Sequence, residues 1–170
     1  MVEALTKTRP PVLGTPDDKP FLYIYRDVLE EIRFNATYRD GKVAAGILVG
    51  RHYQDEPGGA HFVEVGAFVG GTHLGEISEF TRYLRTQWKA AAAAQRYHFP
   101  QDEIVGWYLG DWGSNEKPGQ EAIVLHHTFF AHPWQTGLWV SAKEGPRALR
   151  TKNSSFAETA AALIDSGDAG

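Results

Sequence analysis

The seven histidines of this chain are its best-suited side chains for acid–base or metal chemistry, because the sequence contains no cysteine. Two of them, His126 and His127, are adjacent. With Asp111 and His132 they could supply nitrogen and oxygen ligands to a metal ion after folding. Neighbouring residues of a helix point about 100° apart, however, so such a pair rarely shares one metal. We therefore expect one of the pair to be packed or hydrogen-bonded in the core and the other to be exposed.

Ser114 is the candidate nucleophile, with His126 as the base that would take its proton and Asp111 as the group that would orient the base. Nothing in the spacing demands this arrangement. The segment Gly113-Ser114-Asn115 also lacks the G-x-S-x-G pattern that presents a nucleophile at a sharp turn. We therefore expect Ser114 to be an ordinary turn serine.

The composition is that of one globular domain of 170 residues, with a formal net charge of 17 − 21 = −4. A nucleic-acid-binding protein needs a basic face, so this balance argues against nucleic acid as a partner. The local basic group Arg147, Arg150 and Lys152 is expected to be a solvated strand edge. No apolar run approaches the roughly 20 residues of a membrane span, and no secretory pattern opens the sequence. We expect a cytoplasmic protein that binds neither nucleic acid nor membrane.

The elements that must position these residues are a mixture of helices and strands. Residues 1–20 are proline-rich and indicate an extended arm. Residues 21–156 predict a single α/β domain in which helices flank a mixed sheet. Residues 157–170 are expected to be a tail with a short helix at Thr159–Ile164. The apolar patterns predict strands near 21–25, 43–49, 61–69, 104–109, 137–142 and 148–156, with helices at 28–38, around Phe80, Leu84, Trp88 and Ala91, and from Pro118 to about Phe130.

Two of these predictions bear directly on the candidate site. The run Ile104–Leu109 is apolar almost throughout, which is typical of a strand that is buried on both faces, and it ends just before Asp111. The strands at 43–49 and 61–69 are joined by a loop that contains Pro57, which predicts a β-hairpin.

Three segments, in this order, resemble the JAB/MPN (JAMM) domain family. Gly46-Ile47-Leu48-Val49-Gly50 is similar to the family's G-x-L-x-G strand end. Val105-Gly106-Trp107-Tyr108 is similar to its active-site strand, and the segment from His132 to Val140 resembles the strand after its metal site. The resemblance covers about residues 21–156 and implies the MPN-like, cytidine-deaminase-like form of α/β fold.

Catalytic members of this family hold one zinc with two His and one Asp, and a Glu activates the bound water. When the sequence is laid on the family's pattern, the ligand histidines fall on Leu109 and Asp111, a Ser falls on Gly119 and the ligand Asp falls on Ala122. The Glu falls near Val43. The resemblance therefore implies a metal-less member without catalytic residues or a cofactor.

Such a domain is expected to act as a scaffold or protein-interaction subunit, because metal-less relatives typically pair with a related domain or join larger complexes. Asp111, Trp112 and Asn115 are the expected contact residues, since a loop at a strand end commonly carries function. The expected partner is a second copy of this chain, which would give a homodimer, or a related domain, which would give a heterodimer. Two alternatives remain: a divergent peptidase-like hydrolase rebuilt around Asp111 and His126 or His127, and a module that binds a small ligand or peptide in the vacated pocket.

Overall fold

The computed structural model describes residues 21–38, 42–54, 57, 60–76, 78–111, 120–130, 132–141, 146–152 and 155–165, and at 36–38, 111, 120–121, 152, 155 and 160 it describes the backbone alone. These residues form one α/β domain with eight strands and three helices, so the predicted class of a mixed sheet flanked by helices is confirmed. The elements in chain order are β1 (Leu22–Tyr25), α2 (Arg26–Tyr38), β2 (Val43–Gln54), β3 (His61–Leu74), α3 (Glu79–His98), β4 (Glu103–Asp111), α4 (Gln120–Phe129), β5 (Thr136–Ser141), β6 (Arg147–Lys152), β7 (Ser155–Ala160) and β8 (Ala162–Ile164).

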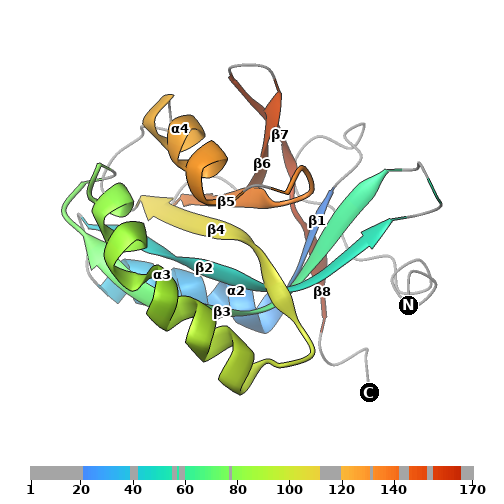
Figure 1. The fold of residues 1–170 in the computed structure, drawn as a ribbon, viewed down its shortest axis with the longest axis horizontal. Coiled ribbons are helices and arrows are strands. Elements are labelled where there is room, and N and C mark those ends of the chain that lie inside the picture. The colour runs from blue at the N-terminus through green and yellow to red at the C-terminus, as the bar shows by residue number, and fades with distance from the viewer. Residues whose placement is uncertain are drawn as a thin grey trace.

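The eight strands form one curled sheet, in the order β7-β6-β5-β4-β2-β3-β1-β8. β7 and β8 occupy opposite ends of this order, although Ala161 alone separates them in sequence. The sheet must therefore curl until its two edges approach each other. The backbone N–H of Ala161 donates a hydrogen bond to the carbonyl oxygen of Pro146, which extends the β6–β7 ladder by one residue before the chain enters β8. Figure 1 shows the chain running from β7 into β8, which pairs with β1.

The β2–β3 hairpin and β4 form the middle of the sheet. The hairpin is antiparallel, with Val43 opposite Leu74 and Gln54 opposite His61, which confirms the predicted hairpin and extends both of its strands. β4 pairs antiparallel with β2 and parallel with β5. Residues 105–110 of β4 are all buried, as the apolar sequence of this strand predicts.

The inside of the curled sheet is filled by a cluster that we term the inner core. α2 begins directly after β1 and closes one end of this core with Val28, Leu29 and Ile32. A single cluster can draw on so many strands only because the sheet curls. The strand residues of the inner core are Leu22, Ile24, Ala44, Leu48, Val63, Val65, Val105, Tyr108, Leu138, Val140, Ala148 and Leu163, with Ala161 between β7 and β8.

A second cluster, the outer core, lies between the other face of the sheet and helices α3 and α4. Figure 1 shows α3 in front of the sheet and α2 behind it. Phe80, Leu84 and Ala91 of α3 are buried in the outer core, which confirms the apolar face predicted from their helical spacing. α4 contributes Ala122 and Leu125. The two cores together bury the sheet on both faces, as a mixed sheet flanked by helices requires.

The helix expected at Thr159–Ile164 is wrong, because these residues lie in β7 and β8. Thr159 pairs with Ala148 of β6, and β8 pairs in parallel with β1. The alanines of this segment favour a helix locally, but strand pairing buries Ala161 and Ala162, and that burial outweighs the propensity. The domain therefore continues through Ile164, past the boundary expected at residue 156.

Two smaller features complete the fold. The single strand expected at 148–156 is two antiparallel strands, β6 and β7, with Arg147 opposite Ala160. Ser78 precedes α3, and its side chain makes no capping hydrogen bond. None of the three described helices is long and apolar enough to cross a membrane.

Candidate functional site

Three of the positions that the resemblance assigns to zinc chemistry lie together in the outer core. Val43, Leu109 and Ala122 belong to this one cluster, with exposed fractions of 6%, 1% and 2%. They come from β2, β4 and α4. Across the β2–β4 ladder Val43 is the register partner of Asp111, so the expected base position faces an expected ligand position. The fold thus places all three positions in one apolar cluster.

The remaining expected residues cannot be placed in the same way. For Asp111 the structure describes the backbone, which ends β4. Trp112, Ser114, Asn115 and Gly119 lie outside the described residues.

The side chains at these three positions can make only apolar contacts. Alkyl side chains offer no lone pair to zinc and cannot take a proton from water. Among the described residues, no group of three or more His, Asp or Glu side chains is arranged to hold a metal ion. A His, Asp or Glu at these positions would also have to be desolvated within the outer core.

His126 and His127 differ in burial, as the helical geometry predicts. His126 is 3% exposed, and the indole Nε1–H of Trp107 donates a hydrogen bond to its Nδ1 at 3.0 Å. The ring of Phe130 stacks against His126. His127 is exposed. The prediction of one packed and one exposed histidine is confirmed.

The environment of His126 decides its protonation. Burial, and secondarily the neighbouring His127, lowers the pKa of His126 to about 4. Because Nδ1 accepts the Trp107 hydrogen bond, the neutral ring carries its proton on Nε2. A base with so low a pKa removes protons poorly near neutral pH. A hydrolase rebuilt around His126 therefore gains no support from its surroundings.

Four aromatic rings at the end of the β2–β3 hairpin form what we term the ring stack. His52 stacks on Trp134 with 4.2 Å between ring centroids and on His61 with 4.8 Å. His132 also stacks on Trp134, at 5.0 Å. His52 Nε2 and His61 Nδ1 are 2.6 Å apart, so one ring donates a hydrogen bond to the other. His132 therefore stacks on Trp134, whereas His126 accepts a hydrogen bond from Trp107.

The ring stack was not predicted from the sequence. The hairpin register, with Gln54 opposite His61, makes His52 and His61 diagonal neighbours, and a predicted register would have indicated this pair. Trp134 packs against the inner core from the segment before β5, and only the folded chain brings it to the hairpin. Burial, followed by the charge of His61, lowers the pKa of His52.

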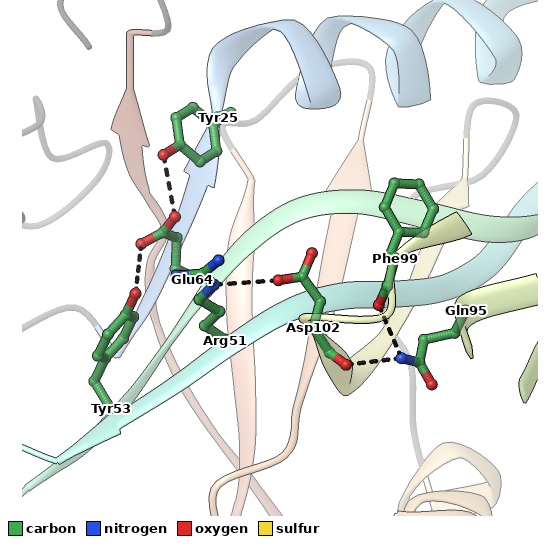
Figure 2. A network of polar contacts seen from close by, with 7 residues as sticks. All are labelled: Tyr25, Arg51, Tyr53, Glu64, Gln95, Phe99 and Asp102. Atoms are coloured by element: carbon green, nitrogen blue, oxygen red, sulfur yellow. Dashed lines mark hydrogen bonds and ion pairs between the residues drawn. The ribbon is translucent and has the colours of Figure 1, made fainter. Parts of the chain in front are cut away.

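A polar network holds this end of the hairpin (Figure 2). The hydroxyls of Tyr25 and Tyr53 donate hydrogen bonds to the two carboxylate oxygens of Glu64, at 3.1 and 3.3 Å. Burial, followed by the charge of Glu64, raises the pKa of Tyr25 to about 12, so its hydroxyl remains a donor at neutral pH. The three side chains come from β1, β2 and β3, and their hydrogen bonds help to keep these strands in register.

The same network reaches the turn between α3 and β4. Arg51 of β2 forms an ion pair with Asp102 at 3.2 Å. The side-chain amide of Gln95 donates hydrogen bonds to the backbone carbonyls of Phe99 and Asp102, at 3.1 and 2.7 Å. These contacts fix the point at which the chain enters β4, the strand that leads to Asp111.

Comparisons with known proteins bear on the fold. No protein-family model matches the chain, and no curated protein matches it. Among solved structures, the chain is similar to the solution structure of protein DSY2949 from Desulfitobacterium hafniense. The TM-score is 0.57 at 18% identity, over 85% of this chain and 93% of that one. At this identity the likeness shows a shared fold.

Proposed function

We propose that this chain is a catalytically inactive MPN-like domain that binds another protein as a scaffold or adaptor subunit. The observation that supports the proposal is the packing of Val43, Leu109 and Ala122 in one apolar cluster. Where a catalytic relative needs a base and metal ligands, these side chains stabilise the fold by hydrophobic burial. Packing at all three positions suits a domain that binds a partner and carries out no catalysis.

The binding surface proposed is the loop from Asp111 to Glu116, with Asp111, Trp112 and Asn115 as contact residues. The elements on either side of this loop are well anchored, because Leu109 of β4 and Ala122 of α4 are buried. Loops that a rigid scaffold positions commonly carry binding residues. The partner proposed is another protein, and a related domain or a second copy of this chain is included.

Replacement of Trp112 with alanine is expected to abolish partner capture. The tagged chain would be purified from its native cells, and the recovered proteins would be quantified by mass spectrometry. We expect the wild type to recover a partner at fixed stoichiometry and Trp112→Ala to recover at least about tenfold less, because a central tryptophan commonly contributes about 2 kcal/mol or more to binding.

The matched control is Tyr97→Ala, which removes an aromatic side chain that is 83% exposed on α3. This variant should recover the partner as well as the wild type does. A monomer without a stoichiometric partner would contradict the proposal. Equal losses in the two variants would place the contact elsewhere and would equally contradict the role of the loop.

A further inference from the structure

The side chain of Arg150, in β6, lies on the inner face of the curled sheet. Ala148, two residues earlier, is fully buried in the inner core, and side chains two apart in a strand share a face. Arg150 is half-buried, with its guanidinium carbon 4.8 Å from the ring centroid of Phe21. No ion pair with a carboxylate is found for Arg150 among the described residues. The solvated strand edge expected for Arg150 is therefore wrong.

Two hydroxyl groups on the strands next to β6 lack hydrogen-bond partners among the described residues. Thr136 and Thr159 are 1% and 5% exposed, and within the described structure neither side-chain oxygen has a partner. Thr159 is the register partner of Ala148, so it shares the inner face. Thr136 shares that face because it precedes the inner-core residue Leu138 by two positions. A buried hydroxyl without a partner costs about 1–3 kcal/mol, so two such groups on the strands that flank β6 call for an explanation.

Register brings the three polar groups together. Gly137 of β5 lies opposite Leu149 of β6, which places Thr136 next to Arg150 across the β5–β6 ladder. Thr159 lies on β7, on the other side of β6. Within the described residues, the Arg150 guanidinium without an ion pair thus shares one face of three adjacent strands with two unpartnered hydroxyls, Thr136 directly opposite it and Thr159 on the diagonal, opposite Ala148.

Aromatic side chains lie at the same end of the inner core as this group, the end that α2 does not cover. Phe21 stands at the start of β1, whereas α2 follows the end of that strand. Phe21 and Trp134 are half-buried and pack against the inner core. The ring of His52 lies nearly parallel to Trp134, with an angle of 8° between their planes. The Phe21 ring therefore contacts the guanidinium, and Trp134 lies at the same end of the inner core.

We propose that this end of the inner core binds an oxyanion, a carboxylate or a phosphate, that is carried by a small aromatic or apolar ligand. The guanidinium of Arg150 matches either oxyanion with two parallel N–H donors. The hydroxyls of Thr136 and Thr159 supply further donors to the remaining oxygens. The rings of Phe21 and Trp134 contact the body of the ligand. This site is independent of the proposed partner-binding loop.

The test is a titration of the full-length ¹⁵N-labelled chain, followed by amide chemical shifts, with benzoate in one arm and phenyl phosphate in the other. Probe concentrations up to about 10 mM would saturate a site with a Kd near 1 mM or tighter. We expect a saturable one-to-one response at β5, β6 and the start of β1 in at least one arm. Saturation by benzoate alone assigns a carboxylate ligand, and saturation by phenyl phosphate alone assigns a phosphate.

Three variants distinguish binding at this site from nonspecific electrostatic attraction between the chain and the anionic probes. Arg150→Gln is expected to raise the Kd at least about tenfold, because a charge-assisted hydrogen bond contributes more than a neutral one. Thr136→Val keeps the charge and the side-chain shape and should raise the Kd about fivefold. Arg85→Gln, which removes an exposed cation from α3, should leave the Kd unchanged.

Two results would overturn the inference. One is the absence of a saturable response in both arms for the folded wild type. The other is an equal loss of affinity in Arg85→Gln and Thr136→Val. If Arg150→Gln fails to fold, Thr136→Val alone still tests whether the site binds the probe. Neither result affects the capture of a protein partner through Trp112, so the two proposals are tested independently.

Discussion

Replacing Gly106 with alanine is expected to leave the chain without a stable native state. Gly106 of β4 is paired in parallel with Thr136 of β5, and an added Cβ would overlap the backbone carbonyl oxygen of Thr136. Both residues are buried in the middle of the sheet, so neither backbone can move without breaking the ladder. Overpacking by side chains typically costs about 1–3 kcal/mol, and a clash with the backbone exceeds that, against a total stability of about 5–15 kcal/mol.

Urea unfolding followed by circular dichroism would measure the effect of Gly106→Ala. Gly66→Ala is the matched control, since Gly66 lies in β3 and nothing stands within 4 Å of the added Cβ. The control should be as stable as the wild type or slightly more stable, because alanine has less conformational entropy to lose. A Gly106→Ala chain that unfolds at the same urea concentration as the control would contradict the close packing of β4 and β5.

Acidification from pH 6.5 to pH 4 is expected to destabilise the fold through His126. The pKa of this residue is about 4 in the folded chain against an ordinary value of 6.5. Between these values the unfolded chain binds a proton that the folded chain excludes, so the free energy of unfolding falls as the pH falls. The difference in pKa corresponds to at most about 3 kcal/mol, fully lost once the pH is below 4.

The variant His126→Gln isolates this contribution. Glutamine does not titrate, and its side-chain oxygen can still accept the hydrogen bond of Trp107. The acid-dependent loss of stability should therefore be much smaller in His126→Gln than in the wild type, whereas exposed His127→Gln should keep most of it, because burial is the larger cause of the His126 pKa shift. Urea titrations at several pH values would measure this. Identical pH dependence in wild type and His126→Gln would show that His126 is not held neutral by burial.

The sequence predicts those parts of the fold that depend on local periodicity. The helical spacing of Phe80 and Leu84 identifies the buried face of α3, and the apolar run from Ile104 identifies β4 as an inner strand. The C-terminal strands are different. The alanine content of the segment around Thr159 favours a helix, and its pairing with β6 and β1 depends on contacts distant in sequence.

The same distinction applies to the candidate sites. The sequence shows that Val43, Leu109 and Ala122 are apolar, and the fold adds that they form one cluster. For Arg150 the sequence is misleading, because a basic residue near other basic residues indicates a solvated edge. Its inward position follows from the curl of the sheet, which no local pattern records. The aromatic rim around Trp134 has the same origin.

The measurement that tests the account most directly is the zinc content of the purified chain. The protein would be prepared without chelators, equilibrated with one equivalent of zinc sulfate, dialysed and analysed by inductively coupled plasma mass spectrometry. Because Val43, Leu109 and Ala122 offer no ligand, we expect less than about 0.1 zinc ion per chain to remain. One zinc ion per chain that is lost in Asp111→Asn would contradict the proposal of an inactive binding domain.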